Sequence, residues 1–309
     1  MVEAGLVASR LVHFSCAIIL FGSALFVLYS GPTASRSERV ARLLPNIVFA
    51  CAIGALLSGV AWFLFTAGNM NGALAGALDG ETLSSVLWDT GFGRMWAARV
   101  VPMLLVVAMV WFRGASMLTH RQIVLLVVLA AALLASLAGV GHTRIHEGAS
   151  AIVHTSADAV HLLAAGAWLG GLVPLGLVVA ACRAKQLPSD EAVFVLSRFS
   201  SMAYLAVAAI VASGSINAWF LIGALSALVG TSYGELLLLK LGLFGLMLCL
   251  AASNRFRLVP SLAKAPIIGQ SDLTLTLLRR HIVAEQILGI LVVGIASLLG
   301  TLSPTIQGS

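Results

Sequence analysis

Four of the seven histidines fall within one short stretch, and three residues of its second half have helical spacing. His154, Asp158 and His161 stand at positions i, i+4 and i+7, which places them on one face of a helix. A carboxylate between two imidazoles can bind a metal ion itself or orient a ligating ring through its N–H. His142 and His146 precede this helix and would lie over its mouth. The alternative is a solvated loop followed by a capped helix start.

Imidazole suits copper, zinc, nickel and iron, so these ligand types do not name the metal. Further candidate ligands are His13, Glu235 and the thioether of Met95, which suits a soft ion such as Cu(I). Arg99, Lys240 and Glu285 are ionisable residues inside apolar stretches, where charge is costly and tends to mark ion or proton pathways. We expect these three to act in ion pairs, proton movement or gating, with Arg99 paired to an acid and Asp158 as the partner of Lys240.

The composition identifies the elements that must hold these residues. Hydrophobic residues make up 60% of the 309 residues and charged residues 10%, whereas a soluble domain has about 25% charged residues. This balance excludes a soluble domain, a disordered chain and a disulfide scaffold. The mean hydropathy is +1.04, which is typical of a polytopic membrane protein. Since a spanning helix needs about 20 apolar residues, eight spans would use roughly half of the chain.

The gaps between charged residues predict an all-α bundle of eight transmembrane helices. Their expected ranges are 9–30, 43–66, 95–112, 122–140, 153–181, 199–225, 234–253 and 281–302. Residues 80–92 are expected to include a short interfacial helix, with Leu83, Val86 and Leu87 on one face. We expect two four-helix halves, residues 1–140 and 141–309, and find no convincing repeat between them. The four cysteines lie in different helices and predict packing residues, with no disulfide framework.

The distribution of basic residues predicts the orientation of the bundle. The odd-numbered connections and the helix ends beside them carry thirteen Lys and Arg residues, against four on the other side. The positive-inside rule therefore predicts that both termini face the outside of the membrane. The net charge of +6 is then a property of the cytoplasmic face and predicts no nucleic-acid partner. The sequence has no G-x-x-x-x-G-K-[ST] loop, so we expect no nucleotide.

An ordered set of short motifs resembles the copper resistance protein D family of bacterial inner-membrane proteins. The resemblance covers nearly the whole chain and is strongest from Gly141 to Pro304. In the first half it rests on His13 with Gly22 and Phe26, and on Phe92-Gly93 with Arg99. In the second half the motifs are, in order, Gly141-His142, Asp158 to His161, Ala167-Trp168-Leu169-Gly170-Gly171, Ser213-Gly214 with Asn217, Thr231-Ser232-Tyr233-Gly234 with Lys240, Asn254-Arg255, and Arg280 with Glu285.

The resemblance implies a multi-pass protein of the bacterial inner membrane, with residues 141–309 as its copper resistance D-type domain. It implies copper transport or homeostasis, with uptake from the periplasm, beside a small periplasmic copper-binding protein. The expected cargo is a copper ion, as Cu(I) or Cu(II), and no enzymatic activity is expected. The alternative that the histidines leave open is a b-type haem electron carrier or membrane reductase, with one haem between His13 and His161. The motifs do not indicate an oligomeric state.

Overall fold

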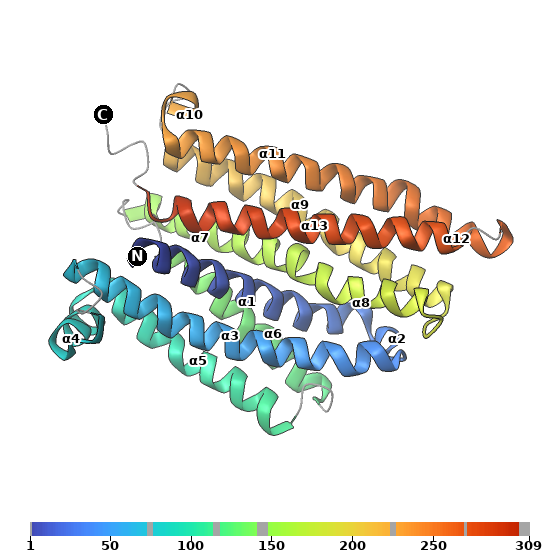
Figure 1. The fold of residues 1–309 in the computed structure, drawn as a ribbon, viewed down its shortest axis with the longest axis horizontal. Coiled ribbons are helices and arrows are strands. Elements are labelled where there is room, and N and C mark those ends of the chain that lie inside the picture. Colours follow the sequence, from blue (N-terminus) through green and yellow to red (C-terminus); the bar gives the residue numbers. More distant parts are fainter. Residues whose placement is uncertain are drawn as a thin grey trace.

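The protein is a bundle of long, roughly parallel and antiparallel helices (Figure 1). The computed structural model describes residues 2–72, 77–113, 118–140, 148–222, 227–268 and 271–302, and these residues form helices and no strand. Eight of the helices are long and apolar enough to cross a membrane, which confirms the predicted fold class and the predicted number of spans.

The first four spans have short helices at their connections. They are α1 (Val2–Ser30), α3 (Glu38–Asn71), α5 (Gly91–Arg113) and α6 (His120–Ala135), the last extended by the 3-10 turn η3 (Ser136–Val140). The short helix α2 (Pro32–Ser35) joins α1 to α3, and α4 (Gly80–Asp89) lies between α3 and α5. The predicted short helix is confirmed as α4: Val86 is buried with Phe63 and Ala67 of α3, and Leu83 and Leu87 pack beside them.

Two of the last four spans contain a π-helical turn. The fifth span runs through α7 (Gly148–Ala165), the π turn η5 (Gly166–Gly170) and α8 (Gly171–Arg183). The sixth is α9 (Ser189–Ile222), and the short α10 (Ala227–Gly230) follows it. The seventh runs through α11 (Ser232–Ser253), the π turn η6 (Asn254–Leu258) and α12 (Val259–Ile268), and the eighth is α13 (Ser271–Leu299).

Prolines account for the two π turns. A proline has no N–H to donate to the carbonyl four residues earlier. Pro174 therefore frees the carbonyl of Gly170 in η5, and Pro260 frees that of Phe256 in η6. The predicted end of the seventh helix at residue 253 matches the end of α11, although η6 and α12 continue the same span to Ile268. The predicted start of the eighth helix at residue 281 was wrong, because α13 begins at Ser271.

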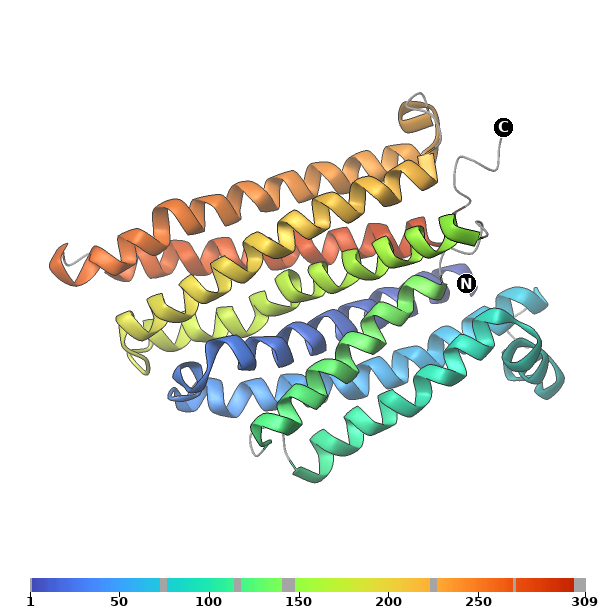
Figure 2. The same cartoon turned by 180° about the vertical axis from the view of Figure 1, so that it is seen from behind.

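Helix α1 occupies the centre of the bundle and contacts α3, α6, η5, α8 and α13 (Figures 1 and 2). Its closest approach is to η5. A Cβ added to Gly22 would meet the backbone of Gly166 and Gly170, and one added to Gly170 would meet the carbonyl of Ile18. Only glycine lets two helix backbones come this close, as at small-residue interfaces in membranes. The two halves of the chain therefore meet through backbone contact at the bundle centre.

Both described ends of the chain lie at the same end of the bundle, together with α4 and α10 (Figure 1). We call this the α4 end, and we call the opposite end, where α2 and α12 lie, the α12 end. At the α12 end Arg36 and Glu191 form an ion pair of 2.6 Å between the two halves of the chain.

Candidate functional site

The face of α7 that carries His154, Asp158 and His161 packs against α9. The His154 ring stacks on Phe220, with the ring centroids 4.9 Å apart and an interplanar angle of 15°. One turn further, Asn217 donates a hydrogen bond of 3.2 Å from Nδ2 to Oδ1 of Asp158. These contacts confirm that the predicted residues share one helix face. The alternative of a solvated helix start was wrong for His154, which is 2% exposed.

Hydrogen bonds set the tautomer of His161. Its Nδ1 lies 3.2 Å from Oγ of Ser213, and that hydroxyl donates to the carbonyl of Ala209 at 2.5 Å. Because the serine proton is already used, Nδ1 of His161 must be the donor to Ser213. A neutral imidazole then has its lone pair on Nε2. The pair of helices therefore holds His161 in a form that is ready to bind a metal through Nε2.

Lys240 brings a third helix, α11, to this cluster. Lys240 lies within electrostatic range of both Asp158 and His161, but in the described part of the chain it forms no ion pair with Asp158 within 4.0 Å. Tyr233, about two turns earlier on α11, is buried and lies within electrostatic range of Asp158. A carboxylate, an imidazole and an ammonium group from α7 and α11 therefore meet beside α9. We call Asp158, His161, Asn217 and Lys240 the α7–α11 cluster.

A second polar cluster surrounds His13 of α1, which is 1% exposed. Nδ1 of His13 lies 2.9 Å from the carbonyl of Ala55 and 3.3 Å from Oγ of Ser58. On the other side of the ring, a guanidinium nitrogen of Arg99 lies 2.7 Å from Nε2. A guanidinium can only donate, so Nε2 is the acceptor and His13 is the neutral tautomer with its proton on Nδ1. In this arrangement the lone pair that would bind a metal is taken by Arg99.

Within the described residues Arg99 forms no ion pair with an acid, contrary to the expectation. Its side chain is 4% exposed, and its Nη1 has no hydrogen-bond partner there. The Trp62 ring packs beside His13, with the centroids 5.6 Å apart. We call His13, Ser58, Trp62 and Arg99 the α1–α5 cluster.

The two clusters are built on the same spacing. Gly59 follows Ser58 and faces the His13 ring, and Gly214 follows Ser213 and faces the His161 ring in the same way. Each serine hydroxyl donates to the carbonyl four residues earlier, Gly54 or Ala209. The matching histidines each stand nine residues before a glycine of the central contact, Gly22 or Gly170. Helices α1 and α3 therefore correspond to α7 and α9.

The correspondence extends to α5 and α11. Each of these helices begins at a threonine whose hydroxyl accepts from the backbone N–H of a glycine three residues later, Gly93 or Gly234. Six residues beyond that glycine stands the cation of the cluster, Arg99 or Lys240. The expectation of no repeat was therefore wrong. The repeat is difficult to see in the sequence for two reasons. It consists of a few polar and glycine positions among interchangeable apolar residues, and the connection between its second and third helices differs in length between the two copies.

The two copies differ in charge. Three residues before the histidine stands Arg10 in the first copy and Asp158 in the second. Arg10 donates to the carbonyl of Gly300 at 2.8 Å, and its guanidinium lies over the Trp62 ring. The first copy thus has two arginines around its histidine, whereas the second has a carboxylate and a lysine. Only the second combines an anionic ligand with an imidazole lone pair.

The other predicted residues lie outside these two clusters. Glu235 is exposed in the first turn of α11, and Met95 is partly buried on α5. The methionine near His13 is Met103, which we did not predict: its methyl and the His13 ring both lie within 4 Å of where a Cβ on Gly59 would be. Glu285 lies in the middle of α13, and Asn254 donates to it at 2.7 Å. His142 and His146 lie outside the described residues.

The described residues contain no group of three or more His, Cys, Asp or Glu side chains that could hold a metal ion. Within them, the α7–α11 cluster supplies two potential ligands, Asp158 and His161. His13 contacts α3 and α5 while His161 contacts α9 and α11, so no contact favours one haem held between these two histidines.

Comparisons with known proteins cover both halves of the chain. A family model described as copper resistance protein D-like, N-terminal domain, matches residues 1–152, and one described as copper resistance protein D matches residues 194–299. Copper resistance protein D of Pseudomonas syringae pv. tomato is 33% identical over 306 residues, covering 97% of each chain. Inner membrane protein YebZ of Escherichia coli is 31% identical, covering 96% of this chain and 98% of the relative. Copper transport protein CutJ of Bacillus subtilis is 27% identical, covering 80% of this chain and 46% of the relative. No solved structure matches this chain significantly.

Proposed function

Because this chain belongs to the copper resistance protein D family, we propose that it carries copper ions across the bacterial inner membrane and holds them at Asp158 and His161. The observation that carries this proposal is the meeting of three helices at the α7–α11 cluster. The carboxylate of Asp158 and the imidazole of His161 lie on the same face of α7 there. Ionisable groups inside a membrane-spanning segment are costly and tend to mark functional sites.

The comparison of the two clusters supports the choice of the second. An incoming cation is repelled by Arg10 and Arg99, which keep their charge at any physiological pH. It must also displace Arg99 from Nε2 of His13. At His161 the hydrogen-bonded nitrogen is Nδ1, and Asp158 supplies a negative charge. We therefore propose that His13 positions Arg99 and that copper is held in the second copy.

Lys240 is the gate in this proposal. A charged lysine cannot bind metal, and its charge opposes a cation beside Asp158. A lysine can lose its proton in an apolar site, whereas an arginine cannot. Copper binding at Asp158 and His161 therefore requires that Lys240 lose its proton or that its ammonium group move away from the site. Arg99, at the matching position, has no such freedom.

We propose uptake as the direction, with the α4 end in the periplasm. The thirteen basic residues predicted for the cytoplasm support this orientation, as does the position of His154 between the α4 end and the α7–α11 cluster. His142, His146 and Glu235 belong to the entry side in this proposal, where a small periplasmic copper-binding protein would deliver the ion. The oxidation state of the copper is left open by these ligand types.

Copper entry into proteoliposomes tests this function. Vesicles containing the purified protein and an enclosed copper-sensitive dye would receive Cu(I) or Cu(II) in separate experiments. We expect Asp158→Asn and His161→Ala to lower the initial rate at least tenfold. His120→Ala, an exposed histidine at the α12 end, is the matched control and should leave the rate unchanged.

A serine pair sharpens the assignment to the second copy. Ser213→Ala removes the acceptor that orients His161, and Ser58→Ala removes the matching hydroxyl beside His13. We expect only Ser213→Ala to weaken copper entry. Wild-type rates in both Asp158→Asn and His161→Ala would overturn the proposed site, and no dye response from wild-type vesicles with either ion would overturn copper transport.

A further inference from the structure

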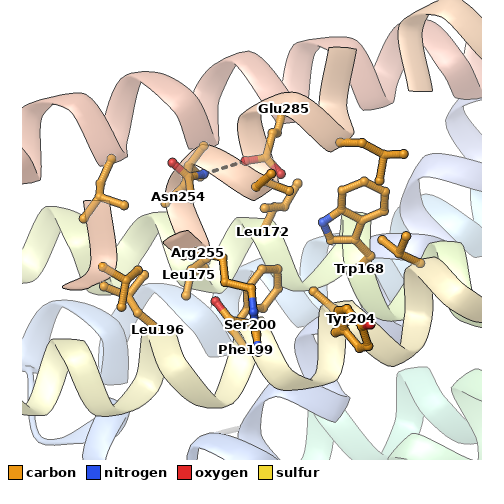
Figure 3. Close-up of a pocket in the computed structure, with 18 of the residues that line it drawn as sticks. Trp168, Leu172, Leu175, Leu196, Phe199, Ser200, Tyr204, Asn254, Arg255 and Glu285 are labelled. Carbon is orange, nitrogen blue, oxygen red and sulfur yellow. Dashed lines mark hydrogen bonds between the residues drawn. The ribbon is translucent and has the colours of Figure 1, made fainter. Parts of the chain in front are cut away.

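A separate cavity of about 160 Å³ lies nearer the α12 end, between η5, α9, η6 and α13 (Figure 3). Along α9 the residues lining this cavity run from Leu196 to Val207, and Val207 stands ten positions before Asn217 of the α7–α11 cluster, about 15 Å along the helix axis. The cavity is therefore distinct from the proposed copper site.

Two buried polar groups face this cavity. Glu285 is 1% exposed, and its Oε1 accepts a hydrogen bond of 2.7 Å from Nδ2 of Asn254. Oδ1 of Asn254 lies 2.9 Å from Nδ1 of His281, so His281 fixes the orientation of the amide that holds Glu285. This chain of contacts leaves the second carboxylate oxygen of Glu285 for another partner.

The Trp168 indole supplies the second group. Its ring is 1% exposed, and Nε1 is buried with no hydrogen-bond partner in the described part of the chain. Figure 3 shows the nitrogen edge of the ring directed into the space between Glu285 and Arg255. A buried donor without an acceptor is destabilising, so this N–H favours a ligand that brings an acceptor.

The π turns place these groups at the cavity. Trp168 belongs to η5, whereas Asn254 and Arg255 belong to η6. A π turn inserts one extra residue into a helix and shifts the side chains that follow, and such turns are frequent at functional sites. Both π turns of the described chain contribute residues to this one cavity.

The cavity opens toward the lipid. Its inner wall is apolar and buried, including Leu172 and Leu278, but two aromatic residues of its rim, Tyr204 and Phe256, are exposed on the outside of the bundle. The Arg255 guanidinium lies 5.6 Å from the centroid of the Tyr204 ring and 5.8 Å from that of Phe256. A ligand dissolved in the bilayer can therefore enter from the side.

We propose that this cavity binds the head group of a lipid-soluble quinone or quinol. A cavity of about 150 Å³ accommodates one benzene-sized ring, which matches the volume found here. A ring oxygen would accept from Nε1 of Trp168, and a quinol hydroxyl on the opposite side would donate to Glu285. The isoprenoid tail would leave between Tyr204 and Phe256. An acyl chain would match the apolar wall but would leave both polar groups without a partner.

Binding of a short-chain ubiquinone to the full-length protein in nanodiscs tests this proposal. Titration of the oxidised and the reduced compound, followed by isothermal calorimetry, should give saturable binding of at least one of them. We expect Trp168→Phe and Glu285→Gln to raise the Kd at least tenfold. Trp111→Phe and Glu81→Gln, at exposed positions away from the cavity, are matched controls and should leave it unchanged.

Thermal unfolding of each variant checks that it is folded. If Trp168→Phe or Glu285→Gln does not fold, the Ser200→Phe variant tests the proposal instead. Its phenylalanine would fill the cavity from α9 and should abolish quinone binding. The proposal would be overturned by the lack of saturable binding to the wild type, by a wild-type Kd in the folded cavity variants, or by equal competition from an alkane of the same length as the quinone tail. None of these outcomes depends on copper transport.

Discussion

The Arg99 guanidinium lies 2.7 Å from Nε2 of His13, and both side chains are almost completely buried. Within the described residues the pair has no carboxylate partner, so the acceptor for Arg99 is the imidazole lone pair of His13. Removing one side chain of the pair therefore leaves the other buried without its hydrogen-bond partner. Leaving a buried charged group unpaired typically costs about 3–5 kcal/mol.

A double-mutant cycle on this pair should show strong coupling. We expect His13→Leu to lower the free energy of unfolding by about 3 kcal/mol, because it leaves a buried charge without an acceptor. Arg99→Met should cost less, and the double variant should be more stable than His13→Leu alone. Unfolding in detergent measures the stability of all four proteins. Loss of bound copper in His13→Leu with unchanged stability would identify His13 as a ligand and contradict this prediction.

Lys240 should tune copper affinity in opposite directions according to its replacement. Lys240→Met removes a positive charge near Asp158 and should tighten copper binding on the order of tenfold, while slowing transport because release is impaired. Lys240→Arg makes the charge permanent and should weaken binding. Equilibrium dialysis of the purified variants measures both affinities. A shift in the same direction for both would show that charge at this position does not control the site.

The contact between Gly22 and Gly170 should be intolerant of a methyl group. A Cβ at either position would overlap the backbone of the facing helix, which cannot move as a flexible side chain can. We expect Gly22→Ala and Gly170→Ala each to lower stability by about 1–3 kcal/mol. Gly242→Ala is the matched control, because a Cβ there meets no atom within 4 Å. It should be neutral or slightly stabilising, since alanine favours the helix.

The cap of α4 should depend on pH. Asp79 accepts from the backbone N–H and the hydroxyl of Thr82, and these hydrogen bonds hold the pKa of its carboxyl below the usual range. A lowered pKa in the folded state means that the cap stabilises α4 above the ordinary pKa of about 3.9 and is lost as the pH falls through the folded value. Hydrogen exchange of residues 80–89 should therefore accelerate in acid and in Asp79→Ala at neutral pH. Equal protection in Asp79→Ala and the wild type would show that the cap contributes nothing.

The predictions from the sequence were most accurate where one physical requirement dominates. A helix in a bilayer must be long and apolar, so eight spans could be counted from the gaps between charged residues. The short helix α4 and the shared face of His154, Asp158 and His161 followed from helical periodicity. Helix ends were less accurate, because helices such as α13 extend past the apolar segment into charged sequence that the membrane does not restrict.

The partners of the buried polar residues could not be predicted in this way. Arg99 was expected to face an acid, and it faces His13; no partner was predicted for Glu285, and it accepts a hydrogen bond from Asn254. Such pairings join residues that are 86 and 31 positions apart in the chain. Helical spacing shows only which residues share a face of one helix. It does not show which face of another helix packs against that face.

The sequence by itself determined that the described chain has eight helices long and apolar enough to cross a membrane and that His154, Asp158 and His161 share one helix face, because length, hydropathy and helical period are local properties. The tertiary structure alone decided that the His13 lone pair is taken by Arg99, that His161 is held by Ser213, and that the two arrangements are copies meeting at Gly22 and Gly170. The reason is that a hydrogen bond between helices depends on their crossing and rotation. These are set by backbone approach at small residues, which hydropathy does not record.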